Sequence, residues 1–359
     1  MNLEERVDWQ AYCNRLGIED LQDLTRVQNG RNEVVRARLA NGRELLFKHG
    51  RQRLANRDGS LLSEGLAYRA FSQLGLSALL PRCILHDRKR NLLVLEWVGD
   101  TSAREKWAGQ EQDSIKWASL GVALARLHGA TDATPEWAAR LLGDFTELIP
   151  SADPVVPDDL VDYPSAHLQL IAIIQADSAV IQNLKRLRTP TAVCLIHGDV
   201  RLDNIIVSGQ EHPKFIDLEL ARVGDPYFDL GTLLGSIVEH ATRQFPLGED
   251  TRASEYARVL LERTAMELRS VIAGYRAEAR GAQDRTVGDE AYLSRVAAFV
   301  GVHLLHRSGA LAEEYCAETR LGRVLAIMGC SFLKNPSYFL RPLSLDASHA
   351  WVQEGRGLR

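Results

Sequence analysis

The chain has 359 residues, of which 45% are apolar and 25% are charged. These fractions are typical of globular proteins and exclude collagen-like, intrinsically disordered and low-complexity chains. At roughly 150 residues per domain, the length predicts about two domains. The 47 acidic and 43 basic residues give a formal net charge of −4, so no global field would attract nucleic acid or an anionic membrane.

Five cysteines are scattered along the chain without a CxxC pair or metal-type spacing. An odd number of scattered cysteines predicts buried thiols in a reducing compartment. The first ten residues, MNLEERVDWQ, are charged where a secretory signal would be apolar. No apolar run reaches the roughly 20 residues that cross a bilayer, so we expect a cytoplasmic protein without a membrane partner.

The first fifty residues change from a helical to a strand pattern. Residues 1–23 have amphipathic helical spacing, and two Asn-Gly pairs, Asn29-Gly30 and Asn41-Gly42, then separate short apolar runs. Asn-Gly between such runs favours a tight hairpin, because both central residues of that turn need positive φ. The predicted strands are 23–28, 32–39 and 43–48.

A helix is predicted over 60–74, between the capping residue Ser60 and the terminating Gly75. Two more strand patterns, 82–86 and 92–98, flank a charged turn. The first hundred residues therefore predict a five-stranded antiparallel sheet crossed by one helix.

The rest of the chain is mainly helical in pattern. One amphipathic helix ends near His128, and the four prolines within 149–166 predict an irregular segment. From Asp229 to the end the pattern is almost wholly helical, with loops near Pro246 and Gly281. The predicted fold class is thus α+β, with a sheet part followed by a larger helical part.

The most informative stretch is His-Gly-Asp-Val-Arg-Leu-Asp-Asn at 197–204. Two apolar runs follow it, at 205–207 and 214–219, and the polar turn between them predicts a hairpin. If the turn is centred between residues 210 and 211, residues whose numbers sum to 421 face each other, which would pair Asn204 with Asp217.

This pairing would bring an amide oxygen and a carboxylate to one small cation. Mg²⁺ prefers one or two carboxylates together with amide, water and phosphate oxygens. Asp199, five residues before Asn204, would lie beside that ion as a proton acceptor. A metal, a base and an in-line hydroxyl are what phosphoryl transfer requires.

The stretch around Asp199, the Ile-Asp-Leu-Glu element at 216–219 and the Gly-Asp-Pro-Tyr-Phe-Asp element at 224–229 resemble the aminoglycoside phosphotransferase and choline kinase family. The resemblance covers most of the chain and implies a two-lobe, protein-kinase-like fold with ATP and Mg²⁺ as cofactors. Many members carry His-Pro-Gly where this chain has Arg201-Leu202-Asp203.

The resemblance also implies roles for single residues. Asp199 would be the catalytic base, and Asn204 and Asp217 the magnesium ligands. Glu219 would contact a second metal ion or only solvent.

Upstream, Lys48 ends the third predicted strand and Glu64 lies one turn into the next helix. The pair resembles the family's phosphate-binding lysine and the helix glutamate that aims it. Both residues also have a purely structural explanation. Lys48 could protect an edge strand from pairing with another strand, and Glu64 could be favoured in the first helical turn by the helix dipole.

The resemblance places the remaining nucleotide contacts in the first hundred residues. The turn containing Asn29, Gly30 and Asn32 resembles the family's nucleotide-covering hairpin, although it is less glycine-rich than a protein kinase's loop. Glu96 and Val98 fall where the segment between the lobes would offer backbone groups to adenine.

The implied organisation is an N-lobe over residues 1–98 and a helical C-lobe over residues 99–359, with ATP between them. A pseudokinase that binds nucleotide without chemistry is a competing hypothesis. The complete set of Lys48, Asp199, Asn204 and Asp217 argues against it.

The acceptor is open at this stage. A second, less specific resemblance is to the branch of the family that phosphorylates Ser or Thr of ribosomally made precursor peptides. Elimination of the phosphate to a dehydroamino acid would then need a partner lyase. The alternatives are an aminoglycoside, a choline-like compound or a sugar hydroxyl; charge in the C-terminal half is mixed and aromatic residues are only 7% of the chain, which neither favours nor excludes them.

Several other polar residues have structural explanations. Asp225 before Pro226 predicts a helix N-cap, and Asp229 would hold the catalytic loop. His303, His306 and Arg307 have spacings of three to four on one predicted helix and can share a face, but a metal site there would lack a second pair of ligands.

Overall fold

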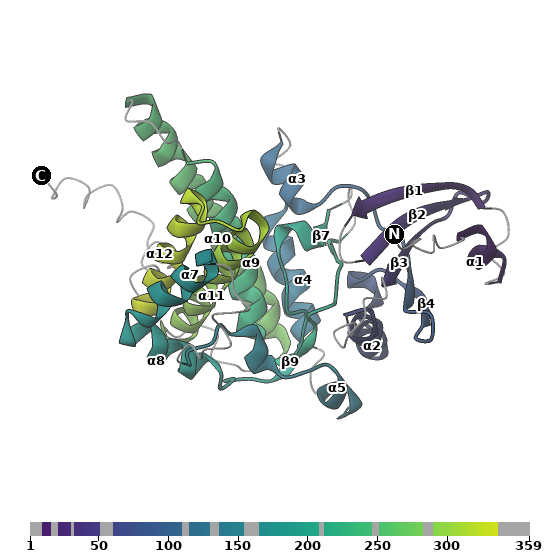
Figure 1. Ribbon diagram of the computed structural model, residues 1–359, viewed down its shortest axis with the longest axis horizontal. Helices are drawn as coiled ribbons and strands as arrows, with labels where there is room; N and C mark the ends of the chain where they lie inside the picture. Colours follow the sequence, from purple (N-terminus) through teal and green to yellow (C-terminus); the bar gives the residue numbers. More distant parts are fainter. Residues whose placement is uncertain are drawn as a thin grey trace, which may run out of the picture.

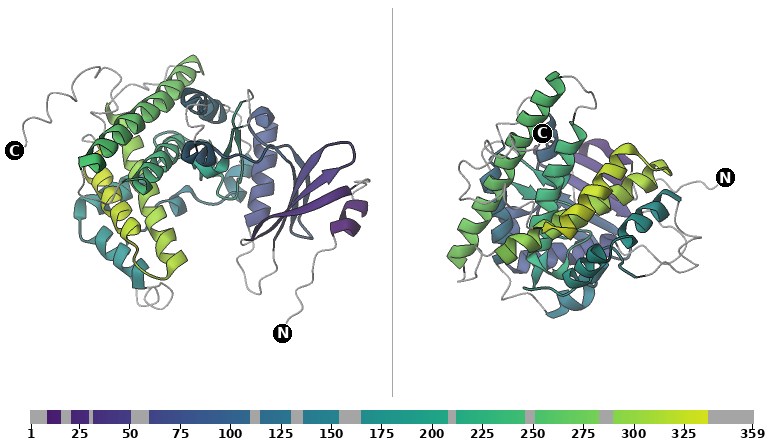
Figure 2. Two further views of the ribbon diagram at one scale, coloured as in Figure 1. Left: turned by 90° about the horizontal axis from the view of Figure 1, so that it is seen from above. Right: turned by 90° about the vertical axis from the view of Figure 1, so that its left-hand side faces the viewer.

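The molecule has a sheet part and a helical part at opposite ends of its long axis (Figures 1 and 2). The computed structural model describes residues 9–15, 21–29, 32–50, 60–109, 115–129, 136–153, 165–207, 212–245, 251–282 and 290–336. Among the helices within these ranges, none is both long enough and apolar enough to cross a bilayer.

The sheet part confirms the predicted five antiparallel strands. They pair in the order β1-β2-β3-β5-β4, which makes β3 the central strand. Their bounds are β1 Leu21–Asn29, β2 Asn32–Leu39, β3 Glu44–Gly50, β4 Cys83–Asp87 and β5 Leu92–Glu96.

The two faces of this sheet are covered by different helices. On β5, Leu92 and Val94 pack with Trp9 of α1 (Trp9–Arg15), whereas Leu93 and Leu95 pack in the cluster that contains α2 (Ser60–Gln73). Because successive side chains of a strand point to opposite faces, β5 is apolar at every position from 92 to 95. The helix predicted over 60–74 is confirmed.

The helix predicted over 1–23 is wrong at its end. Residues 21–23 belong to β1, where Leu21 pairs with Leu39 of β2. Only Trp9–Arg15 of the predicted segment is described as helix. Sheet pairing and burial against α1 outweigh the helical spacing at Leu21, since tertiary contacts override weak local preferences.

The described helices of the helical part are α3 Ala103–Ala108, α4 Trp117–Gly129, α5 Glu136–Leu141, α7 Ser165–Gln175, α8 Ser178–Leu187, α9 Pro226–Arg243, α10 Thr251–Ala282, α11 Glu290–Tyr315 and α12 Arg320–Lys334. Among them, α4 and α10 pack closely against each other. A Cβ on Gly121 of α4 would lie 2.0 Å from the carbonyl oxygen of Val271 on α10, so glycine permits their close approach. Gly281, expected near a loop, lies in the last turn of α10.

Four short strands lie between the two parts. β6 (Cys194–Ile196) pairs with β9 (Arg222–Gly224), and β7 (Ile205–Ile206) pairs with β8 (Lys214–Phe215). The predicted hairpin therefore exists, but its register is shifted by one residue from the prediction. The paired residue numbers sum to 420, so Asn204 faces Ile216, whose N–H donates to the Asn204 carbonyl at 2.9 Å.

Candidate active site

Lys48 joins the sheet part to the helical part. Its Nζ donates to Oε1 of Glu64 at 2.8 Å and to Oδ1 of Asp217 at 2.9 Å. Lys48 lies on the central strand β3, which removes the edge-strand explanation. The Glu64 side chain is only 1% exposed, so its position is not that of a solvated first-turn residue.

Burial and charge act in opposite directions on these three groups. Burial alone would lower the pKa of Lys48, but the carboxylates of Glu64 and Asp217 outweigh it and raise the pKa well above the usual value. Burial raises the pKa of Glu64 to about 7, against the opposing effect of Lys48. Burial also acts to raise the pKa of Asp217, yet Lys48 keeps it below its ordinary value. Lys48 is therefore a charged ammonium that can contact phosphate oxygens.

The carboxylate of Asp199 lies at the centre of the stretch 197–204. Its Oδ2 accepts a hydrogen bond from Nδ2 of Asn204 at 2.8 Å, and Nε of Arg201 donates to both carboxylate oxygens at 2.9 and 3.0 Å. Asn204 Nδ2 also donates to the Asp199 carbonyl at 3.0 Å. The amide nitrogen of Asn204 thus faces the base, which leaves its Oδ1 as the atom available to a metal.

The backbone of this loop is held by Asp229 of α9, as the sequence resemblance implied. Its buried carboxylate accepts from the N–H of His197 at 2.7 Å and from the N–H of Gly198 at 2.8 Å. Gly198 has φ 83°, and a Cβ there would lie 2.0 Å from the carbonyl oxygen of Leu220. Only glycine fits this position.

His197 has a structural role, as predicted. Its Nδ1 accepts from the N–H of Asp199 at 3.2 Å, so Nε2 carries the proton and donates to the carbonyl of Ile216 at 2.9 Å. This imidazole connects the catalytic loop to the residue before Asp217. The predicted N-cap at Asp225 is also present, since its carboxylate accepts from the N–H of Tyr227 at 2.9 Å.

Asp217 leaves the hairpin ladder in a left-handed conformation. Its φ is 66°, a region that aspartate tolerates better than most residues. The sequence prediction placed it directly opposite Asn204, but β8 ends at Phe215 and the backbone then turns. Asp217 therefore lies one residue beyond the cross-strand partner of Asn204, and contacts Lys48 from the other part of the molecule.

The donor set at this point fits one hard cation with incomplete protein coordination. Asn204 offers Oδ1, and Asp217 offers the carboxylate oxygen not used by Lys48. Mg²⁺ takes few protein ligands and completes its octahedron with water and phosphate oxygens. Within the described ranges, no group of three or more His, Cys, Asp or Glu residues could hold a metal ion.

The other predicted nucleotide contacts lie at the two ends of the sheet's strands, because Asn32 pairs with Gly50 at one end of β3 and Glu96 pairs with Leu45 at the other. Asn29 ends β1 and Asn32 begins β2, with Gly30 outside the described residues. Glu96 ends β5, and its N–H donates to the Arg82 carbonyl at 2.9 Å. Val98 follows β5 in the segment between the sheet and α3.

Glu219, which was predicted to contact a second metal ion or only solvent, lies in the turn after Asp217, and the structure tests neither role.

Two contacts around the candidate site were not predicted from the sequence. The hydrogen bonds from Arg201 to the Asp199 carboxylate were not predicted, although Arg201-Leu202-Asp203 in place of His-Pro-Gly indicated a change in this loop. His128 was missed too; its Nε2 lies 3.1 Å from Asp229, and Tyr275 binds its other ring nitrogen at 2.9 Å.

Comparison with known proteins agrees with this geometry. The sequence profile described as the phosphotransferase enzyme family matches residues 23–267. No curated protein sequence matches the chain.

Solved structures with similar folds include the amicoumacin kinase hAmiN in complex with AMP-PNP, Ca²⁺ and Ami, with 15% identity, TM-score 0.59 and coverage of 92% of this chain and 94% of that one. A putative fructosamine-3-kinase from Thermobifida fusca has 16% identity, TM-score 0.51 and coverage of 90% and 98%. A choline/ethanolamine kinase family protein from Mesorhizobium loti has 17% identity, TM-score 0.50 and coverage of 93% and 97%.

Proposed function

Because the chain belongs to the phosphotransferase enzyme family and is thus an ATP-dependent phosphotransferase with a hydroxyl acceptor, we propose that Asp199, Asn204, Asp217 and Lys48 carry this reaction with Mg²⁺. The observation that carries the proposal is the position of Lys48 Nζ, 2.9 Å from Asp217 and anchored by the buried Glu64 at 2.8 Å. A cation held in this way is suited to the phosphates of a nucleotide.

Each residue has one task in the proposed reaction. Lys48 binds nucleotide phosphates, and Asn204 and Asp217 hold the metal, which when bound neutralises charge on the phosphates. Asp199 orients the acceptor hydroxyl and accepts its proton. The hydrogen bonds from Arg201 and Asn204 fix the direction of the Asp199 carboxylate.

The acceptor that we propose first is Ser or Thr of a ribosomally made peptide, which rests on the sequence resemblance. A separate lyase would then eliminate the phosphate. A small-molecule hydroxyl is the second candidate, favoured by the fold similarity to the amicoumacin kinase over 92% of this chain. The lobe boundary that we propose lies near residue 98, after β5 and before α3.

The experiment is incubation with ATP, Mg²⁺ and both classes of acceptor, with a gain of phosphate mass as the readout. Asp199→Ala should lower the rate roughly 100-fold to 10,000-fold, the usual contribution of a general base. Asp217→Ala should abolish transfer and leave the fold intact, because Asp217 is partly exposed. Full activity of either variant would overturn the assignment.

A further inference from the structure

Two arginines beside the proposed base have unused hydrogen-bond donors. Arg201 uses Nε for Asp199, and Arg307 of α11 uses Nε for both oxygens of Glu239, at 3.1 and 3.2 Å. Their terminal nitrogens make no hydrogen bond to any described residue, and Nη1 of Arg201 lies 3.9 Å from Oδ2 of Asp203. A guanidinium has five N–H donors, so four remain on each arginine.

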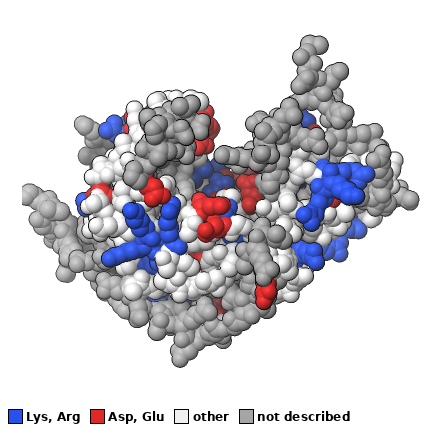
Figure 3. All heavy atoms as spheres, turned by 60° about the horizontal axis from the view of Figure 1, so that its bottom comes forward, with Lys and Arg blue, Asp and Glu red and all other residues white. Residues whose placement is uncertain are grey.

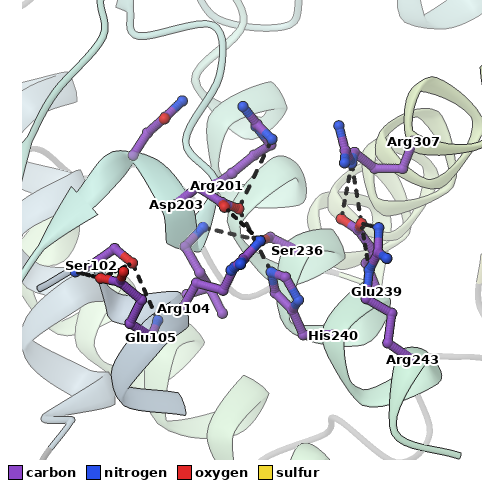
Figure 4. A network of polar contacts seen from close by, with 12 residues as sticks. Ser102, Arg104, Glu105, Arg201, Asp203, Ser236, Glu239, His240, Arg243 and Arg307 are labelled. Atoms are coloured by element: carbon purple, nitrogen blue, oxygen red, sulfur yellow. Dashed lines mark hydrogen bonds and ion pairs between the residues drawn. The ribbon is translucent and has the colours of Figure 1, made fainter. Parts of the chain in front are cut away.

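The two side chains belong to one network of charges. In Figure 4 Glu239 of α9 points toward Arg307, and His240, one residue further along α9, points toward Asp203 next to Arg201. Glu239 is almost fully buried, and Arg243 donates to the same carboxylate at 2.7 Å. This cluster ties α11 to α9, and His240 of α9 lies 3.7 Å from Asp203 in the loop that carries Asp199.

The α11 face of this network lies close to Asp199. The negative charge of Asp199 acts on the imidazoles of both His303 and His306, one turn apart on α11 beside Arg307. In the space-filling view the surface is hollowed between the two parts of the molecule, and basic and acidic side chains both lie in the hollow (Figure 3).

The carboxylates of the network share its guanidiniums. Asp203 contacts Arg104 and Arg201, and Glu239 contacts Arg243 and Arg307. An anion would therefore be met by the unused donors of Arg201 and Arg307.

We propose that Arg201 and Arg307 bind an anionic group of the acceptor, a carboxylate or a phosphate, next to the hydroxyl that is phosphorylated. The inference rests on the proposed phosphotransfer function and narrows its substrate to acidic hydroxyl compounds. Planar guanidiniums recognise such groups through paired N–H donors. An acidic residue beside a peptide Ser or Thr, and a small hydroxy acid, both supply this chemistry.

The test uses acceptors in matched pairs. Serine peptides with Asp or Asn after the serine form one pair, and L-homoserine with its amide forms the other. For the class that is phosphorylated, the acid member should have a kcat/KM at least about tenfold higher than the neutral member. Preference in the first pair identifies a peptide acceptor, and preference in the second a small molecule.

Arg307→Gln should remove this preference by raising KM for the acid member about tenfold, with KM for ATP unchanged. Arg243→Gln is the matched control, because Arg243 also pairs with Glu239 but uses both Nε and Nη2 for it. The control should keep the preference for the acid. Loss of preference in both variants would show a structural effect of the Glu239 cluster and overturn the proposal.

Other outcomes separate this inference from the proposed function. Equal rates for acid and neutral acceptors, or an Arg307→Gln variant that raises KM for ATP instead, would overturn the anion site while phosphotransfer stands. Hydrolysis of ATP by water, measured as ADP release that Asp217→Ala abolishes, reports on the phosphotransfer site alone. If ATP is hydrolysed but no acidic acceptor is phosphorylated, the inference is contradicted. If the protein neither hydrolyses ATP nor phosphorylates any acceptor, the proposed function is contradicted.

Discussion

Lys48 forms ion pairs with carboxylates from both parts of the molecule. Its ammonium lies between the fully buried Glu64 and the partly exposed Asp217. Removal of one partner of a buried pair leaves an uncompensated charge, which costs far more than the net contribution of the pair. The ion pair of Lys48 with Glu64 is therefore expected to stabilise the fold, and in the proposed reaction it also positions Lys48 for the nucleotide.

Lys48→Met should lower the free energy of unfolding by about 3 kcal/mol, because Glu64 would be buried without its cation. It should also weaken the binding of ATP at least about tenfold, measured by calorimetry. The double variant Lys48→Met/Glu64→Gln should recover most of the stability in urea unfolding but none of the ATP affinity. Recovery of both would contradict the nucleotide role of Lys48.

The sequence predicted Asp199, Asn204 and Asp217 as a set, but not how they touch. Motif spacing brings residues to one loop and one hairpin, whereas side-chain partners depend on contacts that spacing does not encode. Arg201 is an example. The sequence shows a charged residue two positions after the base, but it does not predict the hydrogen bonds from Arg201 to the Asp199 carboxylate. The register of the hairpin, shifted by one residue, similarly placed Ile216 and not Asp217 opposite Asn204.

At the scale of elements, the turn at Gly198 is the most demanding part of the catalytic loop. Gly198→Ala combines a φ of 83° with a Cβ 2.0 Å from the Leu220 carbonyl oxygen. We expect a loss of about 3 kcal/mol in urea unfolding and a large loss of activity. Gly129→Ala, where an added Cβ meets nothing within 4 Å, is the control and should change stability by less than about 1 kcal/mol. Equal effects of the two substitutions would contradict this account of the loop.

The contact of α9 with α11 should make stability depend on pH through Glu239. Burial acts to raise the pKa of Glu239, but the hydrogen bond from His303 and the charges of Arg307 and Arg243 outweigh it and hold the pKa well below the usual value. A carboxylate with a lowered folded-state pKa stabilises the fold above its unfolded value of about 4.3 and loses that contribution as pH falls through the folded value.

Glu239→Gln should therefore lower the free energy of unfolding by about 3 kcal/mol at pH 7. The difference from the wild type should shrink as pH falls below about 4. Urea unfolding of both proteins across this pH range provides the measurement. A constant difference at every pH would show that the charge of Glu239 does not contribute.

At the scale of the whole molecule, most of the fold was predictable because its elements are set by local patterns. Short apolar runs and Asn-Gly turns predicted the sheet, and helical spacing predicted α2 and α4. The order of the strands was not local information, and it is what makes β3 central and Lys48 buried beside Glu64. The error at residues 21–23 arose in the same way, since pairing with β2 decided their conformation.

Nucleotide binding should stabilise both parts of the molecule at once. AMP-PNP with Mg²⁺ at about 100 times its Kd should add about 2.7 kcal/mol to the free energy of unfolding. Asp217→Ala should lose most of this gain, because Asp217 is proposed to hold the metal and contacts Lys48 across the two parts. Thermal unfolding with and without Mg²⁺ is the measurement, and a Mg²⁺-independent gain in the variant equal to that of the wild type would contradict the metal role.

The most direct test of the central claim is a crystal structure of the protein with AMP-PNP and Mg²⁺. The account predicts a metal ion about 2.1 Å from oxygens of Asn204 and Asp217, phosphates against Lys48, and Asp199 facing the γ-phosphate. A nucleotide bound with its metal away from Asn204 and Asp217 would contradict it.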